Sequence, residues 1–311
     1  MKKVLLCSLI YLICFSGFSQ NREVTINEYF ERYPHAKLYQ GVYRYTPTLL
    51  PTFDLQPILL DDSKLKITYD VSVEIDTTTQ VKYHDRMIVL LGDKWEKSFG
   101  EGMWIENMSR TAYHNRSDHT IYDLAPGMSK VLNFAVYRDK TNGVIINRAI
   151  FPEKRGFIYR YDEEQPIFKW VLTDECKDSN GYICQKALTS FAGREWVVWF
   201  STEVPIDCGL WKFKGLPGLI IEAYDSDREY EFSLRTLEKT KEPIVKYKIR
   251  EKKLKRENFK KMEMNLHEKP ILYSKGASGY KAFISKERSL GLKTIFDMNN
   301  FTYPYNPMEK E

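Results

Sequence analysis

The sequence predicts a mainly β protein, a single curved antiparallel sheet or half-barrel with a few short helices and an extended C-terminal tail. The clearest signal runs from Leu65 to Ile75, where apolar and polar residues alternate without interruption. Alternation with period two is typical of a strand with one buried face and one solvated face. The same pattern returns around Tyr159, Val198, Phe232 and Tyr247. Turn-forming pairs such as Asn142-Gly143 and Asn180-Gly181 separate these stretches, which indicates a strand–turn–strand order.

Helical signals are fewer, which argues against a sheet in which strands and helices alternate. Between Arg256 and Leu266, Phe259 and Met262 recur at helical spacing, and Pro270 ends the stretch. We expect three further short helices, at residues 24–33, 82–91 and 283–290. Residues 87–91 could equally form a strand.

The composition is that of a globular protein. Of 311 residues, 43% are hydrophobic and 14% are aromatic, which is too many for a disordered chain. No internal repeat or low-complexity linker divides the sequence. We therefore expect one β-rich domain at residues 21–270, followed by a partly extended tail at 271–311. The net charge of +5 is small for this length and does not indicate a nucleic-acid partner.

The first twenty residues predict a secretory signal peptide. Lys2 and Lys3 precede an apolar run from Val4 to Phe18, and the small residues Ser16, Gly17 and Ser19 lie at its end. We expect export, cleavage near Gln20, and a mature protein in the periplasm or associated with the outer membrane. No later apolar run is long enough to span a bilayer, so we expect no transmembrane protein after cleavage.

The strongest local charge lies late in the chain. Residues 239–261 hold eleven Lys or Arg against three Glu. Four of these cations alternate with apolar residues and would share one face of a strand: Lys246, Lys248, Arg250 and Lys252. Such a face is either solvated strand surface, with lysines protecting a sheet edge, or a partner surface that binds an acidic envelope component.

Two histidine-containing pairs are candidates for chemistry. His114 and His119, with Asp118 between them, would either supply metal ligands or form a polar loop, and their spacing fits no metal rule. His84 and Asp85 could form an acid–base pair, but adjacent residues on a strand point apart and no nucleophile motif accompanies them. The common motifs for hydrolases, zinc proteases and nucleotide binding are absent from the sequence.

The most informative stretch is Gly215 to Ile220, which reads GLPGLI. Pro217 at the second position fixes φ, and Gly218 at the third readily takes positive φ, which predicts a type II turn at Leu216-Pro217-Gly218-Leu219, directly after Gly215. Strand-like residues 211–213 and 219–223 flank it. By this hexapeptide the chain resembles the GLPGLI family, secreted proteins of Bacteroidota.

The resemblance extends over about residues 167–234. Matching positions come in the order of the family pattern: Gly181, Tyr182, Cys184, Lys186, Ala187, Gly193, Arg194, Trp196, Trp199 and Val204-Pro205-Ile206. The family then has a glycine–proline pair, where this chain has Gly209-Leu210. These residue types are those of a scaffold. For Arg194 and Glu195 we expect an ion pair or hydrogen bonds at a strand end rather than catalysis.

The family has no established enzymatic activity and is often encoded near outer-membrane TonB-dependent transporters. The resemblance therefore implies a non-enzymatic envelope protein that binds an apolar ligand, a peptide or such a transporter, with aromatic residues as contact surface. A hydrolase or redox enzyme whose site is not visible in sequence, or a purely structural role, are the alternatives.

Cleavage of the signal peptide leaves three cysteines, so at most one disulfide can form within the chain. Cys184 lies in the segment that matches the family and Cys208 just before the turn, which favours a Cys184–Cys208 bridge. A Cys176–Cys184 bridge across an Asn180-Gly181 turn and a buried free thiol are the alternatives. The cysteine spacings match no zinc pattern, and we expect no metal and no cofactor.

Overall fold

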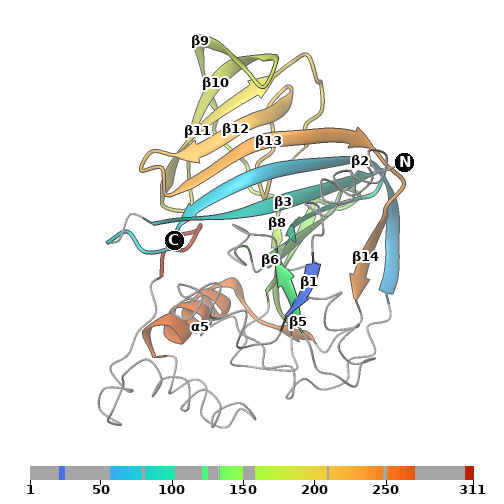
Figure 1. Ribbon diagram of the computed structural model, residues 1–311, viewed down its shortest axis with the longest axis vertical. Coiled ribbons are helices and arrows are strands. Elements are labelled where there is room, and N and C mark those ends of the chain that lie inside the picture. The colour runs from blue at the N-terminus through green and yellow to red at the C-terminus, as the bar shows by residue number, and fades with distance from the viewer. Residues whose placement is uncertain are drawn as a thin grey trace, which may run out of the picture.

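The architecture is taken from a computed structural model (Figure 1). It describes residues 57–78, 81–101, 132, 134–149, 158–208, 210–247, 251–269 and 305–311, together with the backbone of two short strands at 21–24 and 121–124. The predicted signal peptide and the helix predicted at 283–290 lie outside these residues. So does the helix predicted at 24–33, apart from Val24, which ends a strand.

One mixed sheet of 13 strands, mostly antiparallel, dominates the described part of the chain. Its first strands are β2 (Pro57–Glu74), β3 (Lys82–Gly92), β4 (Trp95–Gly100), β6 (Phe134–Asp139), β7 (Val144–Ala149) and β8 (Ile158–Glu164). The later ones are β9 (Val171–Ser179), β10 (Tyr182–Phe191), β11 (Arg194–Ser201), β12 (Leu219–Asp225), β13 (Tyr230–Lys239), β14 (Pro243–Tyr247) and β15 (Glu251–Lys253). The mainly β prediction is confirmed.

The strand order is β15-β8-β7-β6-β4-β3-β2-β13-β12-β11-β10-β9, with β14 also paired to β2. Among the described pairs, β15 with β8 is the parallel one. The 18-residue β2 serves two neighbours in succession, β14 along residues 57–62 and β13 along residues 65–73. Figure 1 shows the sheet strongly curved, with β9 and β10 at one end and α5 near the other. Apart from this sheet, β1 (Asn21–Val24) pairs with β5 (Ile121–Leu124).

The helix predicted at residues 82–91 is wrong, because this stretch is strand β3. The apolar run from Met87 to Leu90 is buried on both faces of the sheet. Met87 and Val89 belong to the main core, whereas Ile88 and Leu90 belong to a second apolar cluster on the other face. A strand covered on both sides loses its alternation, which is why its pattern imitates a buried helix.

The main core lies on the inner side of the curved sheet. Its largest side chains are aromatic and meet edge to face, as in the contact between Trp196 and Phe213 with ring centroids 5.1 Å apart. The buried hydroxyl of Tyr69 donates to the carbonyl of Ile220 (2.8 Å), so its polar end is satisfied. Most of the aromatic side chains of this half of the sheet are therefore used for packing and are not contact surface.

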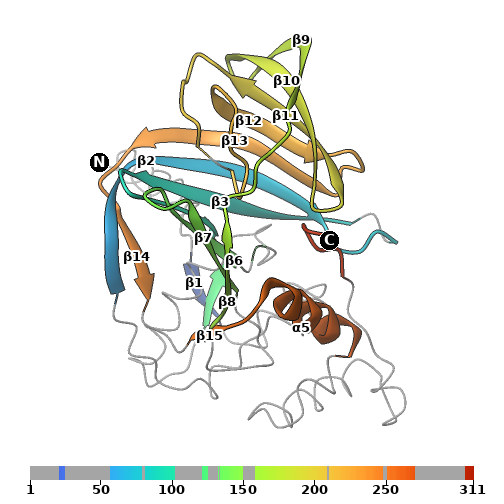
Figure 2. The same ribbon diagram turned by 180° about the vertical axis from the view of Figure 1, so that it is seen from behind.

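In the described residues the helix is α5 (Arg256–Glu268), which confirms the helical spacing noted there. It packs against the sheet through Phe259, whose ring meets that of Tyr161 at 4.8 Å. The end of the predicted tail, Tyr305–Glu311, lies between α5 and the inner side of the sheet (Figure 2). Among the described helices none is long and apolar enough to cross a membrane.

Candidate functional site: a polar hollow on the outer face of the sheet

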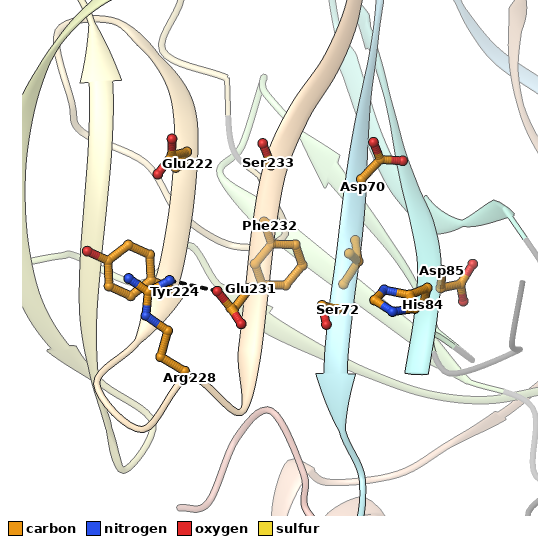
Figure 3. Close-up of a pocket in the computed structure, with 11 residues that line it drawn as sticks. Asp70, Ser72, His84, Asp85, Glu222, Tyr224, Arg228, Glu231, Phe232 and Ser233 are labelled. Carbon is orange, nitrogen blue, oxygen red and sulfur yellow. Dashed lines mark hydrogen bonds and ion pairs between the residues drawn. The ribbon is translucent and has the colours of Figure 1, made fainter. Parts of the chain in front are cut away.

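The outer face of the sheet, which turns away from the main core, carries a hollow of about 400 Å³. Strands β2, β3, β12 and β13 form its floor (Figure 3). Alternation on these strands separates the two faces: Tyr69, Val71 and Val73 of β2 enter the core, while Asp70 and Ser72 face the hollow. The polar half of each strand pattern thus becomes the lining.

Strand register sets two rows of polar side chains across the floor. In one row Glu222, Ser233 and Asp70 are cross-strand partners on β12, β13 and β2. In the other, the partners are Tyr224, Glu231, Ser72 and His84, which adds β3. Neighbouring strands lie about 4.8 Å apart, so the backbones that carry Glu222, Glu231 and Asp70 lie within about 10 Å of one another.

Each of these carboxylates is paired with cations. Glu222 binds Lys177 at 2.6 Å, and Asp70 binds Arg235 at 3.1 Å and Arg86 at 3.6 Å. Glu231 binds Arg228 at 2.7 Å and also contacts Lys82. The guanidinium of Arg228 lies over the ring of Tyr224, 3.8 Å from its centroid. The lining therefore presents both signs of charge side by side.

Two of the acids that line the hollow, Glu222 and Glu231, are held ionised. Burial acts to raise the pKa of Glu222, but hydrogen bonds from Lys177 and Ser179 outweigh it, and the pKa is lowered. Burial likewise opposes the ionisation of Glu231, but Lys82 and Arg228 outweigh it and lower its pKa. A carboxylate in this state accepts hydrogen bonds well and donates a proton poorly.

The β9–β10 hairpin stands beside the hollow. Asn180 at its tip donates to the carbonyl of Leu234 on β13 (2.7 Å), so the tip reaches across to a strand that is not its sheet neighbour. Lys177 of the same hairpin lies 4.5 Å from the ring centroid of Trp199. These contacts fix the cations that pair with Glu222.

Two features of the floor bear on binding. The hydroxyl oxygen of Ser72 is buried and has no hydrogen-bond partner among the described residues. The carboxylate of Asp85 instead accepts hydrogen bonds from the backbone N–H groups of Leu132 (3.1 Å) and Arg86 (2.7 Å). Asp85 thus helps to hold the backbone at residues 86 and 132.

The type II turn predicted at Leu216-Pro217-Gly218-Leu219 is wrong, because Gly218 does not have the positive φ that this turn requires. Positive φ occurs at Gly215 (+91°), not at Gly218. A Cβ on Gly218 would instead lie 2.0 Å from the carbonyl oxygen of Ser201. Of the predicted flanking strands, residues 219–223 lie in β12, but residues 211–213 form a turn closed by a bond from Phe213 N to Leu210 O (3.0 Å).

The other sequence candidates are not brought together. Cys176, Cys184 and Cys208 are free thiols, without the predicted Cys184–Cys208 bridge. Lys246 lies on β14 and Lys252 on β15, which are separate strands, and Lys246 pairs with Glu251 at 3.4 Å. Lys248 and Arg250 lie outside the described residues, as do the histidine pair at 114 and 119 and Asp118.

Sequence reasoning missed the hollow, although its residues were within reach. Asp70 and Ser72 belong to the polar half of the alternation noted from Leu65 to Ile75. The missing information was the register that sets them beside Glu231 and His84. The expected ion pair of Arg194 is confirmed, since its guanidinium lies 2.5 Å from both Asp225 and Glu229.

No family profile and no curated protein matches the chain. Two solved structures of PNGF-II, in the P21 and C2 space groups, are similar to it at 14% sequence identity each. Their TM-scores are 0.42 and 0.44, and each covers 64% of this chain. The chain spans about a third of the length of those structures, 33% and 32%.

Proposed function

We propose that this protein is a non-enzymatic protein of the cell envelope, periplasmic or associated with the outer membrane, and that its polar hollow binds a partner. The candidate partner is an outer-membrane transporter of the TonB-dependent type. Residues 1–20, which have the features of a signal peptide, support export. The GLPGLI resemblance supports the link to transport.

The observation that carries the binding role is the charge state of the hollow. Glu222 and Glu231 have lowered pKa values and are held by lysine and arginine side chains. An acid–base enzyme instead needs a group in its cleft whose pKa is shifted toward the working pH. The paired acids of this site suit recognition and do not suit proton transfer.

The same lining narrows the chemistry of the partner. The hollow offers carboxylates, the guanidinium group of Arg228 and hydroxyls, while the ring of Tyr224 is covered by Arg228 and Phe232 is buried in the core. A polar segment that carries both signs of charge can replace the internal ion pairs one for one, which avoids leaving any charge unpaired. An apolar ligand would bury these charges without compensation.

Site-specific photocrosslinking in intact cells tests the proposal. A photoreactive amino acid at Ser233 lies in the hollow, and one at Glu238 lies on the same strand, exposed and outside it. We expect a discrete outer-membrane adduct from position 233, weakened by Arg228→Glu, and none from position 238. Equal labelling from both positions, or no adduct from either, would contradict a partner at the hollow.

The matched control for Arg228→Glu is Lys66→Glu. Lys66 pairs with Glu242 at 3.2 Å elsewhere on the sheet, so this change breaks an ion pair without touching the hollow. It should leave the adduct unchanged. Mass spectrometry of the mature N-terminus tests export separately, with cleavage expected near Gln20.

A further inference from the structure

A second site, independent of the hollow, lies on the inner side of the sheet and holds the segment Tyr305–Glu311. Met308 of this segment enters the main core and is 8% exposed. Side chains from the sheet, from a loop and from α5 surround it. We call five of these the cradle: Arg194, Lys212, Tyr230, Arg256 and Lys260.

Arg194 and Tyr230 bind the main chain of residues 306–308. Arg194 donates through Nε to the carbonyl of Met308 (3.1 Å) and through Nη2 to the carbonyl of Pro307 (2.6 Å). Tyr230 donates its hydroxyl to the carbonyl of Asn306 (2.6 Å). Three consecutive carbonyls are thus read by side chains, as in the binding of an extended peptide.

The other three bind a carboxylate. Glu309 contacts Lys212, lies 2.7 Å from Arg256, and lies 3.6 Å from Lys260. The occupant therefore has an apolar side chain in the core and, one residue later, an acid among three cations. Charge-assisted hydrogen bonds of this kind are among the stronger ones that proteins make.

The buried cations of the cradle have partners of their own. Arg194 pairs with Asp225 and Glu229, and Lys212 pairs with Glu163 at 2.5 Å and donates to the hydroxyl of Tyr161 at 3.1 Å. Departure of the segment would not leave either cation bare. A site whose charges are satisfied when empty is preorganised for binding.

The segment contributes little to the backbone of the fold. Residues 305–311 form no strand, and within the described part of the chain one backbone–backbone bond holds them, from Lys310 N to Ala192 O (2.8 Å). Its displacement would therefore break no strand pairing. Its other polar contacts are of a kind that another peptide could reproduce.

We propose that the cradle is a peptide-binding site for an extended segment with an apolar residue followed by an acidic one. Tyr305–Glu311 is its resident occupant, and a partner segment of the same chemistry competes for the site. The tethered resident acts at an effective concentration of about millimolar, so it lowers the apparent affinity for the competitor.

The experiment uses the full chain and a fluorescent peptide with the sequence of residues 305–311. Met308→Asp together with Glu309→Lys disables the resident segment. We expect this chain to bind the peptide at least about tenfold more tightly than the wild type does, by fluorescence anisotropy. A peptide with the same two changes should not bind. Adding Lys260→Ala to the chain should weaken binding of the unchanged peptide.

Near-UV circular dichroism establishes whether each chain is folded. If the double variant is folded but does not bind the peptide, the proposal is overturned. If the double variant does not fold, the milder Glu309→Ala chain is used in its place, and there too binding supports the site and its absence overturns it. Failure of both chains to fold also overturns it, because the segment is then an integral part of the core. None of these outcomes depends on the hollow.

Discussion

Gly218 lies directly against the backbone of Ser201. A Cβ built on Gly218 would be 2.0 Å from the carbonyl oxygen of Ser201 and 2.6 Å from its carbonyl carbon. Both atoms belong to backbone, which cannot move aside as a flexible side chain can. Ser201 ends β11 and Gly218 immediately precedes β12, so this approach brings the two paired strands together.

Gly218→Ala should therefore lower the free energy of unfolding by about 2 to 3 kcal/mol, because even one methyl group overfills the space. Gly215→Ala is the matched control. Gly215 has φ of +91° but open space around it, with the nearest atom of Trp170 at 3.7 Å, so only backbone strain of about 1 kcal/mol is expected. Urea unfolding measures both. A Gly218→Ala protein as stable as the wild type would contradict the steric account.

Arg194 is buried, with 1% of its side chain exposed, and forms ion pairs with Asp225 and Glu229. Arg194→Met leaves the buried carboxylate of Asp225 without its ion-pair partner. Loss of one member of a buried pair costs about 3 to 5 kcal/mol, and we expect that loss of unfolding free energy.

The exposed pair Arg235–Asp70 provides the comparison. Its side chains are 43% and 51% exposed, so water replaces the lost partner. Arg235→Met should cost less than about 1 kcal/mol. Similar losses of unfolding free energy in both variants would contradict the claim that the buried ion pair of Arg194 contributes more to stability than the exposed pair.

The strands were predictable wherever one face of the sheet is solvated. Leu65 to Ile75 showed its period because Asp70 and Ser72 face outward while Tyr69 and Val71 face the core. The pattern left helix and strand open at Met87 to Leu90, because apolar residues cover both faces of the sheet there. The alternation of apolar and polar residues depends on one face of the strand being solvated, so a strand that is buried on both faces does not show it.

The site was less predictable because it depends on long-range pairing. The contact of Glu231 with Lys82 joins residues on β13 and β3, which are two strands apart. The Pro217-Gly218 turn failed for a related reason: the demand for glycine comes from Ser201 on another strand and not from the turn itself. Composition does not reveal which strands become neighbours.

The cysteines make a direct prediction for thiol reactivity. Cys176 is exposed on β9, whereas Cys184 and Cys208 are buried. Burial raises the pKa of Cys184 to about 11 and that of Cys208 well above its ordinary value, so neither forms thiolate at pH 8. In the chain without residues 1–20, which hold Cys7 and Cys14, a disulfide-exchange reagent should label one thiol quickly in the native protein and all three in denaturant. Cys176→Ser should remove the fast phase, and a total below three in denaturant would indicate a bridge.

Glu263 predicts an unusual pH dependence of stability. Burial, reinforced by the negative charge of Glu309, raises the pKa of Glu263 from 4.5 to about 7. The hydroxyl of Tyr305 donates to its Oε2 at 3.3 Å. Below pH 4.5 both the folded and the unfolded states hold the proton. Between pH 4.5 and about 7 the folded state keeps it while the unfolded state loses it, so stability falls as the pH rises.

Glu263→Gln keeps an acceptor for Tyr305 and removes the titration. Relative to this variant, the wild type should lose about 1 to 3 kcal/mol of unfolding free energy between pH 4.5 and 7.5. The comparison cancels the titrating groups that do not interact with Glu263. Glu309 does interact with it, but Lys212, Lys260 and Arg256 outweigh burial and lower the pKa of Glu309, so this acid stays ionised across the range. Urea unfolding of both proteins at several pH values gives the difference curve. A flat difference curve would mean that Glu263 is ionised in the folded state across this range. The positive charge of Lys260 would then outweigh the effect of Glu309 on the pKa of Glu263.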